Sequence, residues 1–386
     1  MPEQHAKLSA SGAKRWMSCP PSVALEAKFE DKETSYAKEG TLAHSLAEAI
    51  INYNAGNIKK TEFNKILKNI KKDELYNQEM QDYIEDYAAA VWEFVNEAKA
   101  KCKDVIILTE QRVHFDEYVP EGFGTCDVVI VADDELHIID LKYGKGVEVF
   151  AENNPQLRLY GLGAIDAFSL LYDFDKVKMT IIQPRLNNIS SEIMPVNFLT
   201  DWGRYTVKPA ADLASRGEGE FKAGDHCRFC KAKATCRARA DANLELAKME
   251  FVEPDLLQDE EIGEVLRKAE QLSHWVKDIT EYALLEAVNH GKKWTGWKLV
   301  EGRSNRKYTD EIKVADTLKE AGFDEAALYE KKLYGITAME KIVGKKKFAE
   351  LLNGLIEKPA GKPALVPESD KRPELKSAAK KDFEEE

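Results

Sequence analysis

The chain has 386 residues, of which 44% are hydrophobic and 32% charged, with a formal net charge of −12 at pH 7. This length and apolar content suffice for two or three globular domains, or for one large domain with appendages. The acidic balance argues against a protein that binds nucleic acid over its whole surface. An enzyme that holds cations and grips DNA in one groove stays compatible, because it needs only a local positive track.

Sequence features that would indicate export, membrane insertion or a motor are missing. No run reaches the apolar length of a membrane helix, and residues 1–16 lack the apolar core of a secretory signal. We therefore expect a cytoplasmic protein with no membrane segment. No GxxxxGK[ST] loop occurs, so no nucleotide-driven motor is expected in this chain.

The first residues with chemical potential are Cys19 and His44. Cys19 precedes Pro20 and Pro21, which hold the backbone extended. A helix with an apolar face is predicted from Thr41, the expected N-cap, and His44 lies in its first turns. Taken alone, such a histidine is more often a structural or surface residue than a ligand.

The next predicted elements lead into a hairpin. Residues 79–100 have the apolar spacing of a helix, and residues 104–115 form a β-branched strand. Glu110 in that strand is most simply a strand-end charge, although it could face a site. Residues 126–131 and 136–143 are then predicted as two strands joined by an Asp-Asp turn.

Two acids and a lysine lie on this hairpin. Side chains alternate along a strand, so Asp140 and Lys142 point to the same face. Asp127, at the start of the partner strand, can lie close to Asp140. Two carboxylates suit Mg²⁺ or Mn²⁺, and the lysine can orient a water or hold a phosphate oxygen. A surface ion pair between Asp140 and Lys142 is the simpler alternative, because D-x-K triplets are common by chance.

A helix that opens at Asn154-Pro155 adds a glutamine and a tyrosine four residues apart, and therefore on one face. Together with the hairpin, this arrangement resembles the PD-(D/E)XK nucleases, in particular their RecB-like branch. In that branch an aspartate, an acid-x-lysine and a glutamine-xxx-tyrosine form the active site. The matching residues are Asp127, Asp140, Lys142, Gln156 and Tyr160.

The resemblance implies an α/β fold with an αβββαβ core and a helical C-terminal extension. To complete this core, we expect strands at 177–184 and 192–198 and a helix at 201–216. The resemblance also implies that His44, and the main-chain carbonyl of Leu141, join Asp127 and Asp140 as ligands of Mg²⁺ or Mn²⁺.

The cysteines suggest a second metal site. Cys227, Cys230 and Cys236 have the short spacing that lets thiolates reach one ion or cluster, and Cys19 could supply the fourth ligand. One cysteine before the core and three after it resemble the iron-sulfur RecB-like proteins, such as AddB-type helicase-nucleases and CRISPR-associated RecB-like exonucleases. That resemblance implies a [4Fe-4S] cluster that staples the two ends of the nuclease domain. Coordination chemistry alone also allows Zn²⁺, and free thiols are the remaining alternative.

The C-terminal part is predicted to be mainly helical from 241 to 356, with a disordered tail at 357–386 that is rich in proline and charge. Residues 292–308 are predicted as a strand segment that interleaves basic and aromatic side chains, a pattern that can follow a phosphate backbone and stack on bases. A solvated hairpin is an equal alternative for this segment. The candidate DNA-binding residues are Lys292, Lys293, Trp297, Arg303, Arg306 and Lys307.

The wider sequence resembles a phage-encoded family of unknown function within the RecB-like nucleases. We therefore expect residues 1–240 to form a nuclease domain closed by a four-cysteine metal site. The implied activity is a Mg²⁺- or Mn²⁺-dependent deoxyribonuclease, preferentially an exonuclease in phage DNA recombination or replication inside a bacterial host. The implied partners are DNA and phage recombination or single-strand-binding proteins. The alternatives are a non-cleaving DNA- or partner-binding module on a nuclease fold, and a zinc-stapled interaction protein.

Overall fold

The computed structural model describes residues 6–30, 35–247, 259–300, 311–321, 339, 343–352 and 355. The chain divides into two compact units, Met1–Glu286 and Ala287–Glu386. Three of the candidate basic residues (Arg303, Arg306 and Lys307) and the predicted tail at 357–386 lie outside the described residues. Among the helices of the described ranges, none combines the length and hydropathy that a membrane span requires.

A five-stranded mixed sheet forms the centre of the first unit, with its strands in sequence order. The neighbours are antiparallel except β3 and β4, which are parallel and are therefore connected by a crossover helix, α6 (Pro155–Phe168). The strands are β1 (Ile106–His114), β2 (Phe123–Ala132), β3 (Glu135–Leu141), β4 (Lys176–Gln183) and β5 (Asn188–Pro195).

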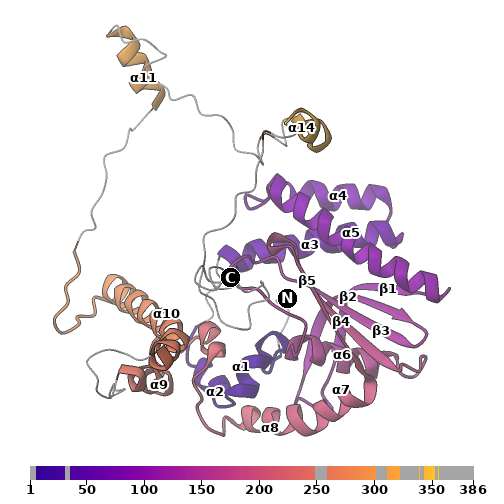
Figure 1. Cartoon of the computed structure of the whole chain (residues 1–386), viewed down its shortest axis with the longest axis horizontal. Helices are drawn as coiled ribbons and strands as arrows, with labels where there is room; N and C mark the ends of the chain where they lie inside the picture. Colours follow the sequence, from indigo (N-terminus) through magenta and orange to yellow (C-terminus); the bar gives the residue numbers. More distant parts are fainter. Residues whose placement is uncertain are drawn as a thin grey trace, which may run out of the picture. The chain divides into compact units, whose positions relative to one another are not determined.

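Helices cover both faces of this sheet, so the unit is a three-layer α/β structure (Figure 1). One face packs against α3 (Ser35–Ala55), α4 (Lys60–Ile70) and α5 (Gln78–Lys101). The other packs against α1 (Ala13–Ser18), α6, α7 (Val196–Trp202) and α8 (Lys208–Arg216). Because β3 is covered on both faces, all of its residues after Glu135 are buried.

The predicted order of helix, three strands, helix and strand is present as α5, β1, β2, β3, α6 and β4. The predicted start of α6 is also confirmed. The Asn154 side chain accepts hydrogen bonds from the backbone N–H groups of Gln156 and Leu157, and Pro155 occupies the first turn. This cap fixes the end of α6 that lies nearest to β3.

Several predicted boundaries are wrong. Helix α3 begins at Ser35, and Thr41 is an interior residue whose hydroxyl donates to the Ala37 carbonyl at 3.1 Å rather than an N-cap. The last strand is predicted at 192–198. The observed strand, β5, starts earlier and ends at Pro195, because α7 begins at Val196. The helix predicted at 201–216 comprises the end of α7, a π-helical segment and α8. The π segment begins at Gly203, where an added Cβ would lie 2.8 Å from Tyr118.

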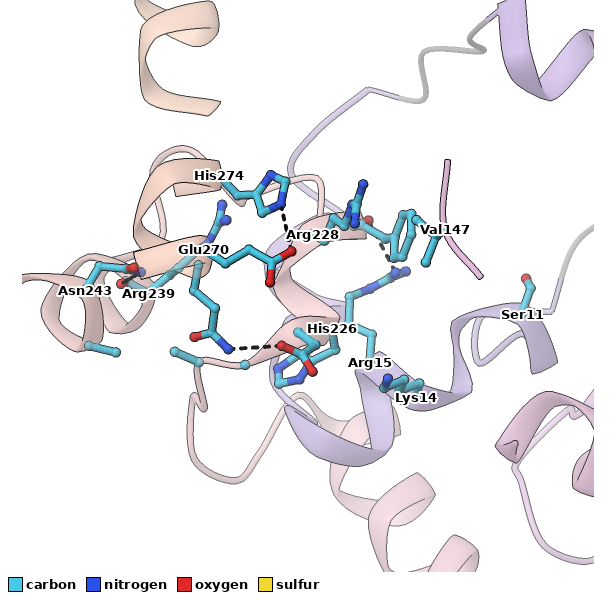
Figure 2. Close-up of a pocket in the computed structure, with 16 residues that line it drawn as sticks. Ser11, Lys14, Arg15, Val147, His226, Arg228, Arg239, Asn243, Glu270 and His274 are labelled. Carbon is cyan, nitrogen blue, oxygen red and sulfur yellow. Dashed lines mark hydrogen bonds and ion pairs between the residues drawn. The ribbon is translucent and has the colours of Figure 1, made fainter. Parts of the chain in front are cut away.

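The rest of the first unit includes the cysteine segment and two further helices. Helix α1, the short turn η4 (Asp225–Phe229), α9 (Arg237–Ala247) and α10 (Asp259–His290) all contribute residues to one cavity (Figure 2). The remaining elements are η1 (Ala10–Gly12), α2 (Ser22–Glu26), η2 (Pro184–Leu186) and the π segment η3 (Gly203–Val207).

The second unit contains α11 (Glu311–Glu320) and α14 (Lys345–Leu351) among its described residues. A basic and aromatic strand was predicted at 292–308. Its described part, residues 292–300, contains a turn in which the Trp297 N–H donates to the Trp294 carbonyl, and it contains no strand. The rest of the predicted segment, 301–308, lies outside the described residues.

Candidate functional site

The two acids of the hairpin lie on adjacent antiparallel strands. Asp127 on β2 accepts a hydrogen bond from the Leu141 N–H of β3 at 2.6 Å. Asp140 is only 3% exposed, and its Oδ2 lies 2.8 Å from Lys142 Nζ. Asp140 and Lys142 therefore share a face, as the alternation predicts. Their contact is an ion pair between a buried carboxylate and a half-buried lysine, rather than a pair of two exposed side chains.

Gln156 connects this pair to the capped end of α6. Lys142 Nζ donates to Gln156 Oε1 at 2.9 Å, and Gln156 Nε2 donates to Asp140 Oδ1 at 3.1 Å. The same Nε2 lies 3.2 Å from the Tyr160 hydroxyl. Both carboxylate oxygens of Asp140 thus have a cationic or amide partner, and four of the predicted residues form one polar network.

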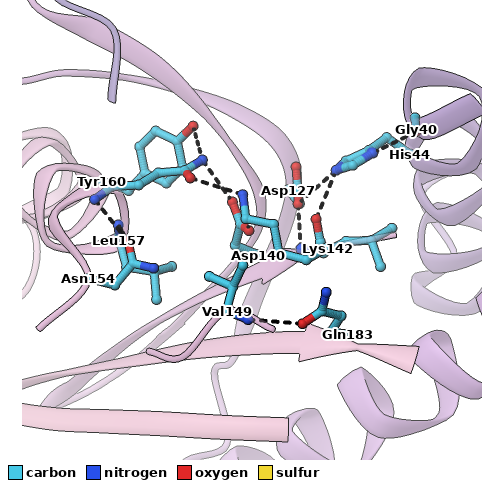
Figure 3. A network of polar contacts seen from close by, with 12 residues as sticks. Gly40, His44, Asp127, Asp140, Lys142, Val149, Asn154, Leu157, Tyr160 and Gln183 are labelled. Atoms are coloured by element: carbon cyan, nitrogen blue, oxygen red, sulfur yellow. Dashed lines mark hydrogen bonds and ion pairs between the residues drawn. The ribbon is translucent and has the colours of Figure 1, made fainter. Parts of the chain in front are cut away.

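His44 reaches the site from α3 on the opposite side (Figure 3). Its Nδ1 lies 2.8 Å from the Gly40 carbonyl, one helical turn earlier. Its Nε2 lies 3.1 Å from the Leu141 carbonyl and 3.4 Å from Asp127 Oδ2. When Nδ1–H donates to Gly40, Nε2 presents a lone pair to two oxygen atoms. Three metal-donor atoms therefore converge on one point.

This donor set fits a hard divalent cation. Neighbouring ligands of an octahedral Mg²⁺, at about 2.1 Å from the ion, lie about 3 Å apart. The Nε2 distances of 3.1 Å to Leu141 O and 3.4 Å to Asp127 Oδ2 are close to that separation. Within the part of the chain that the structure describes, no three His, Cys, Asp or Glu side chains are placed so that they could hold a metal ion. The set therefore depends on the main-chain carbonyl of Leu141.

Burial and neighbouring charges shift the pKa values of His44, Asp140 and Lys142. Burial would lower the pKa of His44, but the Asp127 carboxylate, together with the Gly40 carbonyl and Asp140, raises that pKa to about 9. Burial raises the pKa of Asp140, against the attraction of Lys142. Burial alone would lower the pKa of Lys142, yet the Asp140 carboxylate raises it. Without a metal, two cationic side chains thus face the two acids.

Two further acids lie beside His44. Glu48 and Glu110 line a small cavity of about 10 Å³ together with His44 and Asp127. Burial raises the pKa of Glu48. Glu110 lies opposite Asp127 between two paired positions of the β1–β2 ladder, and its backbone has φ 47°, which is unusual for a side-chain-bearing residue. Two roles were possible for Glu110, a charge at a strand end or a residue that faces the site. Its place in the cavity beside His44 and Asp127 supports the second.

Two features of the site were not predicted from the sequence. One is the Gly40 carbonyl, which orients His44. The only sequence pattern that indicates this contact is the four-residue spacing common to every helix. Tyr87 of α5 lines the same small cavity as His44, and the α5 pattern marks it only as an apolar-face residue. Glu39, near the start of α3, pairs with Arg185 at 3.2 Å and does not line this cavity.

The cysteine segment packs against the N-terminal helices, although the two are far apart in sequence. Helix α1 contacts η4, and Arg15 of α1 donates to the Phe229 carbonyl at 3.3 Å. Glu26 of α2 accepts from the Lys231 N–H at 2.8 Å and pairs with Arg15 at 2.8 Å. Cys19 directly follows α1 and Cys227 lies in η4, so these two predicted ligands belong to adjoining elements.

The thiols themselves are mostly enclosed. Cys19, Cys227 and Cys230 are buried, and Cys236 is half-buried. Burial raises the pKa of the Cys230 thiol to about 12. Among the residues that the structure describes, the cysteines are not gathered tightly enough to hold a metal, so the four-cysteine site remains a prediction.

The predicted DNA-binding residues that the structure describes belong to the second unit. Lys292 Nζ lies 4.5 Å from the centre of the Trp294 ring, and Trp297 is 82% exposed. Lys293 is exposed beside them. Basic and aromatic groups are therefore accessible on this turn, but nothing places them with respect to the site on β2 and β3.

Two comparisons relate the chain to known proteins. The sequence matches a protein family described as "Protein of unknown function (DUF2800)" over residues 5–373. Among solved structures, the one described as "Crystal structure of SSO0001" is 14% identical with a TM-score of 0.25, and the match covers 59% of this chain and 95% of that chain. The family match spans every residue of the candidate site and all four predicted cysteine ligands.

Proposed function

The chain belongs to the DUF2800 family, and we propose that it is a divalent-metal-dependent nuclease that hydrolyses phosphodiester bonds in DNA. The observation that carries this proposal is a cluster of three donor atoms next to the buried Asp140 and its ion pair with Lys142. His44 Nε2 lies within 3.4 Å of both Asp127 Oδ2 and the Leu141 carbonyl oxygen. Asp140 immediately precedes Leu141 on β3, and Lys142 is the first residue after this strand.

The proposed fold type is PD-(D/E)XK, in its RecB-like form. Its support is the element order from α5 to β4 and the distribution of the polar residues over these elements. The two acids lie on β2 and β3, the glutamine and tyrosine on the first turns of α6, and the histidine on α3. This distribution matches the motif order from which the resemblance was drawn.

The proposed chemistry is metal-assisted hydrolysis. Mg²⁺ or Mn²⁺, when bound, would be held by His44, Asp127 and the Leu141 carbonyl, and would lower the pKa of a water and offset charge on the phosphate. Asp140 is the proposed fourth ligand, although its oxygens face Lys142 and Gln156 in the described structure. The chain's own groups do the positioning. The Gly40 carbonyl fixes the imidazole of His44, and the Leu141 N–H fixes the carboxylate of Asp127.

Lys142, Gln156 and Tyr160 supply the polar groups on the other side of the acids. Lys142 Nζ is held between Asp140 and Gln156 at 2.8 and 2.9 Å, so the ammonium is oriented before substrate binds. From there it can hold the attacking water or a phosphate oxygen. Gln156 and Tyr160 orient the strand, and their spacing on α6 sets both groups on one side.

We further propose that the cysteines hold a [4Fe-4S] cluster, with Zn²⁺ as the alternative. The support is the packing of α1 against η4, which brings the Cys19 end of the chain to the segment with Cys227 and Cys230. A role as an exonuclease of phage recombination or replication rests on the resemblance alone.

Cleavage of end-labelled DNA tests the proposal. Linear and circular substrates, single and double stranded, are incubated with Mg²⁺, Mn²⁺ or EDTA. Wild type should cut only with metal, and Asp140→Asn should lose at least about a hundredfold in rate, as the loss of an oriented charged group predicts. Asp133→Asn is the matched control, because Asp133 is an exposed acid at the turn of the same hairpin.

The substrate pattern then defines the activity. Loss of linear substrates alone would establish an exonuclease, and the labelled end would give its polarity. Metal-dependent cutting by a clean Asp140→Asn preparation at the wild-type rate would contradict the assignment of the site. Binding of DNA without cleavage in every condition would favour the non-cleaving module.

A further inference from the structure

A cavity of about 640 Å³ in the first unit is distinct from the residues of the candidate site. It is lined by α1, η4, α9 and α10, together with Val147 from the loop between β3 and α6 (Figure 2). Cavities of 300 to about 1,000 Å³ are typical of small-molecule and cofactor sites. This cavity is therefore large enough for a nucleotide.

The charged groups that line the cavity are mainly basic. Lys14 and Arg228 are exposed, and within the described ranges neither has an acidic partner. Arg15 and Arg239 also line it and are held in place by ion pairs with Glu26 at 2.8 Å and Asp278 at 2.6 Å.

Two acids also face the cavity, and each already has a neighbour. Asp225 accepts a hydrogen bond from Gln271 at 3.0 Å, and Glu270 lies 3.7 Å from His274. A hydrogen bond from the neutral Gln271 leaves the charge of Asp225 in place, so the cavity has both signs of charge. Among the described residues, Lys14 and Arg228 are cations of this cavity without a carboxylate partner, and they are the groups that a phosphate would meet.

An aromatic platform lies among these cations. Phe229 is 64% exposed although it lines the cavity, and its main-chain carbonyl is held by Arg15 at 3.3 Å. The Arg228 guanidinium lies 6.0 Å from the centre of the same ring. An exposed, anchored aromatic ring beside an arginine is the arrangement on which bases of single-stranded nucleic acid stack.

The cavity is connected to the candidate site by a short, anchored loop. Val147 is five residues after Lys142, so their Cα atoms are separated by at most about 18 Å. The buried Gln183 side chain donates to the Gly144 carbonyl at 2.6 Å and to the Val147 carbonyl at 2.8 Å. Lys145, between these two anchors, is exposed. A strand can thus run from Lys142 past Lys145 to the cavity along cationic side chains.

We propose that this cavity binds one nucleotide of a single-stranded segment of the DNA substrate, with its base on Phe229 and its phosphates at Lys14 and Arg228. The inference rests on the proposed nuclease function and adds a substrate-strand subsite beyond the scissile phosphate. A stacked base and two phosphate contacts give affinity with little sequence preference and with a marked dependence on salt.

Fluorescence anisotropy of labelled oligo(dT) with the full chain in EDTA tests this subsite without cleavage. Phe229→Ala should weaken binding about 5- to 100-fold, the range expected for one stacked base. Arg228→Ala should also weaken binding and reduce the salt slope by about 0.7, and Phe229→Tyr should restore affinity. The control is Phe198→Ala, because Phe198 is 66% exposed on α7 and does not line the cavity.

Wild-type affinity in both Phe229→Ala and Arg228→Ala would overturn the inference, as would no binding by the wild type. The cleavage assay of Asp140→Asn is a separate readout. Binding through the cavity with no cutting would support the subsite and sink the nuclease. If wild type cuts DNA and the cavity variants bind as tightly as wild type, the nuclease function would be supported and the subsite would be wrong. Because Arg228 is exposed, its variant should fold even if Phe229→Ala does not.

Discussion

Two histidines of the first unit, the half-buried His44 and the buried His137, show how neighbours decide the charge of a residue. Burial would lower the pKa of His44, but the adjacent Asp127 carboxylate raises it to about 9. Burial lowers the pKa of His137 well below its ordinary value, and Lys178 lowers it further. His137 Nε2 lies 2.7 Å from the Thr180 hydroxyl in the sheet, so this ring is satisfied as a neutral group. A histidine in the sequence does not reveal which of these cases applies.

The pKa of His137 predicts a loss of stability in mild acid. Below pH 6.5 the unfolded chain binds a proton at this histidine and the folded chain does not, so the free energy of unfolding falls as pH decreases. Lys178 and its partner Glu97, at 3.6 Å, are the charged groups beside the ring. Between pH 7.5 and 5.5 wild type should lose about 1.4 kcal/mol more than His137→Gln.

Urea unfolding at the two pH values measures this difference. His137→Gln keeps a polar group facing Thr180, and His114→Gln, at an exposed position near the end of β1, is the control. Equal losses in wild type and His137→Gln would show that His137 is not held neutral in the folded protein.

At the scale of elements, the sequence predicted the parts whose signals are local. The hairpin of β2 and β3 follows from β-branched strands and a two-residue turn, and the start of α6 follows from Asn154 and Pro155. The β5 boundary and the π segment at Gly203 were missed. Gly203 meets Tyr118, which is distant in sequence, so the segment depends on packing that no local pattern contains.

The close packing of β2 against α6 predicts that Gly124→Ala impairs the site. A Cβ at Gly124 would lie 2.6 Å from the Tyr160 ring, whose hydroxyl lies 3.2 Å from Gln156 Nε2. The ring must move and take the Gln156 contact with it. We expect at least about a tenfold loss of cleavage rate and a stability loss of about 1 to 3 kcal/mol.

Cleavage rate and urea unfolding of the purified variant measure both effects. Gly144→Ala is the matched control, since an added methyl group there meets no atom within 4 Å. Wild-type cleavage by Gly124→Ala would mean that the position of the Tyr160 ring does not matter for the reaction.

At the scale of the whole molecule, the site depends on contacts between distant segments. The sequence identified the side chains, but a donor set of His44, Asp127 and the Leu141 carbonyl requires α3 to lie across the end of β3. The opposing position of Glu110 requires the β1–β2 register. These facts arise from packing of elements, which is why spacing alone left His44 and Glu110 open.

The last long-range contact joins the two ends of the first unit and predicts the role of the cysteines. Glu26 ties α2 to Lys231, 205 residues later, and Cys230 is buried next to this tie. If the cysteines hold a cluster, Cys230→Ser should lose its absorbance in anaerobically purified protein and lower the melting temperature and soluble yield together. Cys102→Ser is the control, because Cys102 is equally buried but caps α5. If the wild-type protein contains zinc and shows no visible absorbance, zinc would be the metal that the cysteines hold. If the wild-type protein contains no metal and melts at the same temperature as Cys230→Ser, the cysteine site would be wrong. The Glu26 contacts would then hold the two segments together.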